Sequence, residues 1–143
     1  MSTTGLAHFD DTVHKTNVWL KEVMIAFEWE NRQTAYRALR VTLHTIRDHL
    51  PIAILAHLSA QVPTLIRGIL FEGWKPEASV HPDRSLSDFL HPIQQAFDRD
   101  IYPEPETIAQ RVFGVIANHV SEGEISHIEQ ALPKHVRDIV KLR

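Results

Sequence analysis

The chain contains two similar stretches of sequence: "QVPTLIRGIL" at residues 61–70 and "ALPKHVRDIV" at residues 131–140. In each copy the apolar residues after the proline are spaced three and four apart, which is the period of a helix with one buried face. Proline is well tolerated in the first turn of a helix, so Pro63 and Pro133 are each expected to open one.

The repetition extends over most of the chain when seventy is added to each residue number. A repeat of this kind indicates that one helical unit occurs twice, and an internal duplication is its simplest account. The match is weak between about residues 31 and 42, where the register can slip by a few residues. Identical pairs include Leu20 with Leu90, Ala26 with Ala96, Phe27 with Phe97, Ile46 with Ile116, His49 with His119, His57 with His127 and Arg67 with Arg137.

Helical spacing of apolar residues predicts an all-α protein, because no stretch alternates apolar and polar residues as a strand would. We expect N-caps at Asn31, at Ser85 or Ser87, and at Ser121, and we expect Pro92 to kink its helix. The predicted helices cover about residues 13–27, 31–50, 51–58, 63–70, 85–97, 108–120, 121–128 and 133–140.

These elements predict about eight helices, arranged as two similar four-helix halves packed into one compact helical domain. The first repeat would comprise residues 1–72 and the second residues 85–143. Between them, residues 73–84 hold two prolines, one glycine and several polar residues, which is the composition of a linker.

Composition limits the function further. The 143 residues include 43% hydrophobic and 23% charged residues, as expected of a soluble globular protein, and no cysteine, which excludes thiolate catalysis and Cys-ligated zinc. The formal net charge of −3 offers no basic surface for nucleic acid. With neither a signal peptide nor an apolar stretch long enough to span a bilayer, we expect a cytoplasmic protein without a membrane partner.

Four of the ten histidines form a repeated set: His49 and His57 in the first half, His119 and His127 in the second. If the members of a pair met in space, they would be candidates for metal binding or proton transfer. The structural alternative is that His49 and His119 satisfy open carbonyls at helix ends. Because no carboxylate recurs beside either pair, we favour the structural role and expect no metal or cofactor.

Arg67 and Arg137 recur one turn into their helices and could bind an anionic ligand. A fork of donors to carbonyls or carboxylates inside their own half is the more ordinary role, and we favour it. Ser121 is explained as an N-cap, so a mechanism pairing it with His119 or His127 has little support. No nucleophile elbow, phosphate loop or dinucleotide fingerprint is present, so we assign no catalytic residue and do not expect an enzyme.

Two tryptophans, Trp29 and Trp74, lie outside the helical stripes and have no copy in the other half. They either seal the junction between the halves or, if exposed, mark a surface for a partner or for self-association. Trp19 and Phe89 correspond to each other and are expected in the core.

Four stretches of the sequence carry a resemblance to a known family: "AQVPTLIRGIL" at 60–70, "FEGWKP" at 71–76, "DFLHPIQQAFD" at 88–98 and "VSEGEISHIEQALPKHVRDI" at 120–139. On these stretches the chain resembles the bacterial domain-of-unknown-function family numbered 2267 in the DUF series, from the first helix to Val140. It departs from the family pattern in Val62, where leucine is usual, and in Pro92, which interrupts a helix. The resemblance implies a helical fold and supplies no active site.

The sequence therefore favours a small protein-interaction or scaffold module without catalysis, whose partner is another protein or a second copy of itself. The alternative is an enzyme or small-ligand-binding protein with a site between the two halves.

Overall fold

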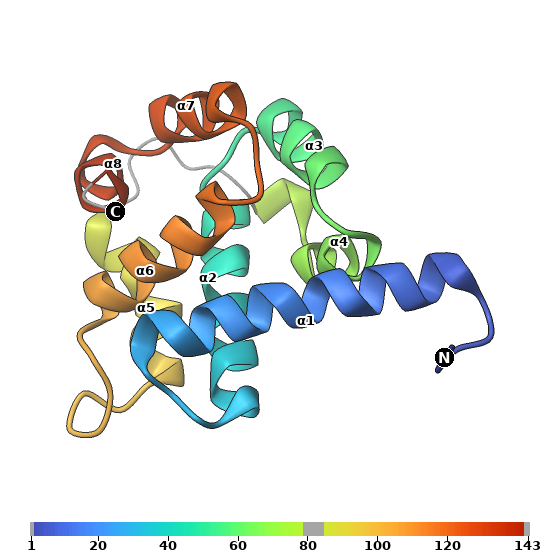
Figure 1. Cartoon of the computed structure of the whole chain (residues 1–143). Coiled ribbons are helices and arrows are strands. Elements are labelled where there is room, and N and C mark those ends of the chain that lie inside the picture. The colour runs from blue at the N-terminus through green and yellow to red at the C-terminus, as the bar shows by residue number, and fades with distance from the viewer. Residues whose placement is uncertain (1, 79–84, 142–143) are drawn as a thin grey trace.

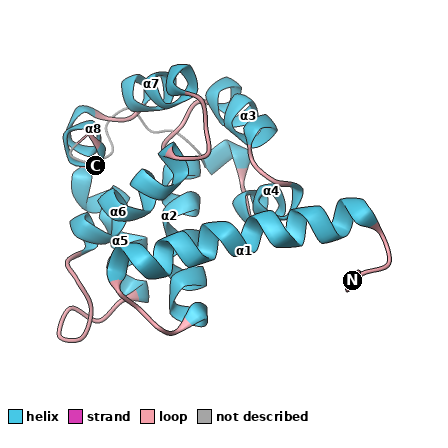
Figure 2. Cartoon of the chain, in the orientation of Figure 1, coloured by secondary structure: helices cyan, strands magenta, loops and turns pink. Residues whose placement is uncertain are grey.

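The structure is a computed structural model that describes residues 2–78 and 85–141. Within these ranges it contains α-helices and no strand, so the all-α prediction is confirmed (Figures 1 and 2). The helices are α1 (Ala7–Phe27), α2 (Arg32–Asp48), α3 (Ile52–Gln61), α4 (Thr64–Phe71), α5 (Leu86–Ala96), α6 (Pro105–Ala117), α7 (Glu122–Ala131) and α8 (Lys134–Val140), with a 3-10 turn at Pro76–Ala78.

The predicted caps explain where several helices begin. The Asn31 side chain accepts hydrogen bonds from the amides of Gln33 and Thr34, at 2.8 and 3.2 Å. Ser85, rather than Ser87, caps α5 through a reciprocal capping box with Asp88. The Ser121 hydroxyl accepts from the Glu124 amide, at 3.1 Å, and so caps α7.

Proline precedes the first residue of several helices, as expected, and one helix contains a proline in its interior. Pro51, Pro63 and Pro133 each stand directly before the first helical residue of α3, α4 and α8. By contrast, α5 runs on through Pro92. Proline has no N–H and disturbs the preceding turn of a helix, so carbonyls of that turn benefit from a hydrogen-bond donor on another helix. The buried Thr45 hydroxyl of α2 is such a donor, since it donates to the Phe89 carbonyl at 2.6 Å.

The core is one continuous cluster to which each of the eight helices in the described ranges contributes buried side chains. Trp19 and Phe89 are 1% and 0% exposed, which confirms them as core residues. Figure 1 shows α1 across the front of the molecule with α2 behind it, while α3 and α7 lie side by side at one end.

The helices of the predicted halves are interleaved. Helix α1 packs against α6, and α5 packs against α2. The first helix of each half therefore packs against the second helix of the other half. Contacts within each half also correspond to one another. The α1–α2 contact corresponds to α5–α6, the α2–α4 contact to α6–α8, and the α3–α4 contact to α7–α8. The internal duplication remains a prediction. A duplicated chain is expected to show corresponding helix contacts of this kind.

Candidate functional site

A groove of about 650 Å³ lies between α1 and α6, at the seam where the two predicted halves meet. It exists because small residues stand where the helices face each other: Ala26 on α1, and Gly114 and Ala117 on α6. Ile25, 67% exposed, lies along its rim. The remaining lining residues are Glu22, Gln110, Arg111, Val115 and Asn118.

Glu22, which lines the groove, belongs to a polar pair that crosses the seam. The Nε2 atom of His119 contacts a carboxylate oxygen of Glu22, and the Asn118 amide lies 3.5 Å from the other oxygen. The His119 ring is stacked on the buried Trp19 indole, with centroids 4.7 Å apart and planes 15° apart. Stacking and hydrogen bonding together fix the orientation of the imidazole.

A second hollow, of about 420 Å³, lies on the other side of this pair. His119 lines it together with His14 and Val18 of α1 and Gln61 at the end of α3. The Gln61 side chain also accepts the Ser121 amide at 2.9 Å, which ties the end of α3 to the start of α7. Glu22 and His119 therefore form a wall between two open spaces.

Arg111 supplies a fixed cation at the groove. Its Nη1 donates to the Ala26 carbonyl, at 3.0 Å, and its guanidinium lies 5.5 Å from the centre of the Phe27 ring. Both contacts hold the exposed side chain in place at the end of α1. Among residues 2–78 and 85–141, no carboxylate forms an ion pair with it.

Arg37 makes the reciprocal contacts from the other half. It donates to the Ala96 carbonyl at 3.1 Å, and its guanidinium lies 4.7 Å from the centre of the Phe97 ring. Arg37 of α2 therefore contacts the end of α5, and Arg111 of α6 contacts the end of α1. The repeat spacing does not reveal this exchange, because Arg111 follows Arg37 by 74 residues rather than seventy. The four extra residues make one helical turn, and α2 has 17 residues against 13 in α6.

The repeated histidines do not share one environment. His49 is 4% exposed at the end of α2, where its Nδ1 lies 2.8 Å from the Thr45 carbonyl and its ring meets Phe89 edge-on. His57 and His127 are exposed on α3 and α7. Of the four, His119 lines the second hollow and contacts Glu22 of the groove, and this Glu22 partner has no counterpart that seventy-residue spacing would reveal. In the described part of the chain, no group of three or more residues has the arrangement of a metal site.

Arg67 and Arg137 both bind carbonyls of their own half. Arg67 Nε donates to the Ser59 carbonyl at 2.7 Å, and Arg137 Nε donates to the Glu129 carbonyl at 2.8 Å. A second nitrogen of each reaches the residue before the helix-opening proline, Val62 at 3.4 Å or Leu132 at 3.3 Å. Each arginine therefore ties a short helix to the end of the preceding one.

The two unmatched tryptophans are half-buried. Trp29 stacks on Phe27, with ring centres 4.2 Å apart, and lies 5.9 Å from both Phe97 and Tyr102. It packs across the seam, yet it also lines a hollow of about 620 Å³ beside Ile25. Trp74 packs against Phe71, at 5.1 Å.

A comparison with family models matches residues 16–139 to the family described as "Uncharacterized conserved protein (DUF2267)". The chain belongs to the DUF2267 family. The matched residues run from within α1 to α8 and include Glu22, Arg111 and His119. None of the curated proteins compared with this DUF2267 chain matches it.

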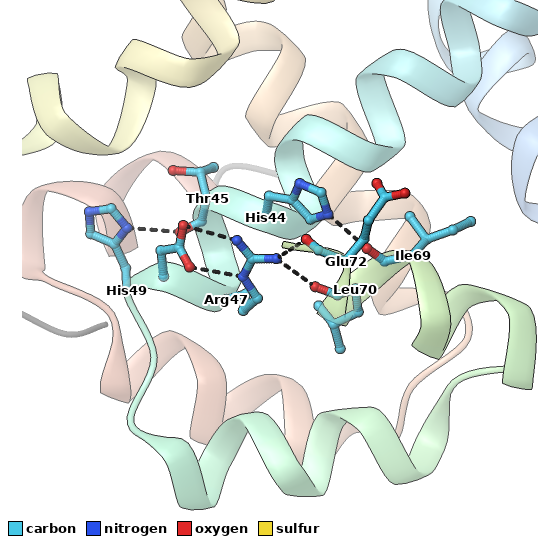
Figure 3. A network of polar contacts seen from close by, with 8 residues as sticks. His44, Thr45, Arg47, His49, Ile69, Leu70 and Glu72 are labelled. Atoms are coloured by element: carbon cyan, nitrogen blue, oxygen red, sulfur yellow. Dashed lines mark hydrogen bonds and ion pairs between the residues drawn. The ribbon is translucent and has the colours of Figure 1, made fainter. Parts of the chain in front are cut away.

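A second polar network of this DUF2267 chain is structural (Figure 3). Arg47, 5% exposed, donates to the carbonyls of Leu70 and Glu72, each at 2.9 Å, at the end of α4. His44 Nε2 donates to the Ile69 carbonyl at 2.7 Å. Burial lowers the pKa of His44, and the neighbouring Arg47 adds to this effect. Arg47 stands among the apolar stripes of α2 without a copy in α6, so no pattern in the sequence indicates it.

The described helices include none that is both long and apolar enough to cross a lipid bilayer.

Proposed function

We propose that the protein is a small helical interaction module without a catalytic role, and that a partner protein binds in the groove between α1 and α6. The observation that carries this proposal is the groove itself, with its floor of small residues and Ile25 exposed on its rim. A concave, partly apolar surface bordered by polar groups is what protein anchors bind.

The groove also indicates the chemistry of the partner. Arg111 is oriented by Ala26 and Phe27 and has no acidic partner among the described residues, so it favours a carboxylate on the bound segment. An aliphatic side chain would fill the space above Ala26 and Ala117. The net charge of −3 supports a protein partner over a nucleic acid. We place this module in the cytoplasm, away from any membrane.

Photo-cross-linking tests this function. A photoreactive amino acid at the exposed Asn118, in protein expressed at native abundance, is expected to capture a discrete partner, whereas the same probe at exposed Lys134 on α8 is not. Arg111→Glu should abolish capture, and Arg99→Glu in the loop after α5 should preserve it. Thermal unfolding verifies that both variants fold. Equal capture by both probes, or capture that Arg111→Glu leaves intact, contradicts the proposal.

A second candidate is a small-ligand-binding protein or enzyme with its site at the same seam. The oriented His119 imidazole, hydrogen-bonded to Glu22 between two open spaces, is the observation that favours it. A hydrogen-bonded imidazole can transfer a proton, and a planar stack on Trp19 keeps it in place. Here a ligand should raise the melting temperature of the wild type and of His57→Gln but not of His119→Gln. A ligand screen without any such differential shift argues against this candidate.

A further inference from the structure

We infer that the partner segment in the groove between α1 and α6 is an α-helix, with an acidic residue and a basic residue seven positions apart on its bound face. The inference rests on the proposed function and names the kind of segment that binds. The acidic residue binds Arg111, the basic residue binds Glu22, and aliphatic residues between them fill the groove. Two observations carry it: opposite charges at two points along the groove, and small residues between them.

The two charges lie at different heights along the helices. Arg111 donates to the Ala26 carbonyl at 3.0 Å, whereas the Glu22 carboxylate, one turn earlier on α1, contacts Asn118 and His119. The two helices are therefore antiparallel along the groove. Seven residues separate Arg111 from Asn118 on α6, which is about 10.5 Å along the helix axis. Because Glu22 meets Asn118, a similar distance separates the two charges along the groove.

Both charged groups have capacity for a further contact. A guanidinium has five N–H donors, and the Ala26 carbonyl accepts from one of those on Arg111. Within residues 2–78 and 85–141, Arg111 forms no ion pair. Glu22 keeps 29% of its side chain exposed beside its contact with His119, and a carboxylate accepts several hydrogen bonds. The groove can therefore bind one anionic and one cationic side chain at the same time.

The groove favours a helix over the other forms in which peptide segments bind. A segment that adds a strand needs a free sheet edge, and the described ranges contain no strand. A polyproline segment needs a groove lined by aromatic rings, and the described lining residues include none. Small residues at Ala26, Gly114 and Ala117 instead allow a third helix to approach both α1 and α6 closely.

Helical geometry gives the spacing of the charges on the partner. Residues seven apart lie on one side of a helix, about 10.5 Å apart along its axis, whereas residues three or four apart reach only about half that distance. The residues three and four positions after the acid lie on the same side and contact Ile25, 67% exposed at the rim. The acid comes first, because a helix is stabilised by an acid near its N-terminus and a base near its C-terminus. The bound helix therefore runs parallel to α6.

Peptide selection on the full chain tests the inference. Two display libraries are used, both of about 16 residues so that a helix can form: one of alanine-based helices randomised on one face, and one fully random. The wild type should enrich helices with Glu or Asp followed seven residues later by Lys or Arg. Arg111→Glu should enrich a base in place of the acid, and Glu22→Lys an acid in place of the base. Arg99→Glu, in the loop after α5, should select the same peptides as the wild type.

Fluorescence anisotropy with the most enriched peptide measures the two contacts separately. Arg111→Glu and Glu22→Lys should each weaken binding about tenfold or more, and the milder Glu22→Gln should weaken it less. A peptide with its acid and base exchanged should bind the double variant, Arg111→Glu with Glu22→Lys, more tightly than it binds the wild type. Circular dichroism verifies the fold of each variant.

Three results overturn the inference: enriched peptides without the charge pair, a proline-rich or extended consensus from the random library, and affinities that the charge reversals leave unchanged. Failure to select any peptide overturns it as well. If Asn118 still captures a partner in the cross-linking experiment, only the helical segment is wrong. Loss of both capture and selection contradicts the proposed function too.

Discussion

Replacing Arg47 with methionine should destabilise the protein by about 3 kcal/mol. Arg47 is 5% exposed and donates to two main-chain carbonyls at the end of α4, those of Leu70 and Glu72. A hydrogen bond from a charged donor contributes about 1.5–3 kcal/mol when its acceptor is buried. The Leu70 carbonyl belongs to a fully buried residue, whereas that of the exposed Glu72 can bind water instead, so it contributes less. The half-exposed contact with Asp48 adds at most about 1 kcal/mol.

Urea unfolding followed by far-ultraviolet circular dichroism measures this effect. The midpoint should fall while the slope of free energy against urea stays unchanged. Arg47→Lys keeps the positive charge but not the several N–H donors of the guanidinium group, so it should lose about half as much stability as Arg47→Met. Hydrogen exchange should show the loss of protection concentrated at the end of α4.

Arg40→Met is the matched control, because Arg40 lies on the same helix and binds the same residue through the exposed Glu72 carboxylate, at 2.6 Å. It should cost less than about 1 kcal/mol. If Arg47→Met unfolds within about 0.5 kcal/mol of the wild type, or no more readily than Arg40→Met, the capping role assigned to Arg47 is wrong.

Three further predictions concern single side chains. Thr42→Val should stabilise the protein by about 1 kcal/mol in urea, because the buried Thr42 hydroxyl has no hydrogen-bond partner among the described residues. Since burial lowers the pKa of His44 below 6.5 in the folded state, the unfolded chain binds its proton first as the pH falls. Stability should therefore drop as the pH falls through the unfolded-state pKa of about 6.5, and His44→Gln, but not the exposed His57→Gln, should reduce that drop. Arg67→Met and Arg137→Met should each lower the melting temperature, because two carbonyl contacts of each arginine match; the loss should be somewhat larger at Arg137, which also donates to the Gln130 carbonyl, and an effect at one site alone would contradict this equivalence.

The sequence was a sufficient guide where local chemistry decides the structure. Asn31, Ser85 and Ser121 cap helices because a short polar side chain at that point satisfies amides that the helix leaves open. The prolines at 63 and 133 open helices for an equally local reason. The resemblance to the DUF2267 family, which rests on the same packing and capping residues, is confirmed.

The candidate site was harder to predict because it depends on contacts between distant segments. His119 was identified, but its partner Glu22 lies on α1, 97 positions earlier. Arg111 was missed because one extra helical turn in α2 hides its equivalence with Arg37. The groove itself depends on the small side chains at Ala26 and Gly114. Such residues carry no catalytic or ligand-binding group, so a search of the sequence for those groups does not find them.

The interleaved packing of α1 on α6 and of α5 on α2 has a consequence for how the molecule can fold. A fragment of residues 1–72 would expose the side of α1 that α6 covers and the side of α2 that α5 covers, and the second fragment would expose the reverse. Neither half is then an independent folding unit, and melting should be a single cooperative event. Separate halves could recover their buried surfaces only by associating in a two-fold pair. The covalent link between them replaces that bimolecular step with a high effective concentration, so that the fold does not depend on how much protein the cell contains.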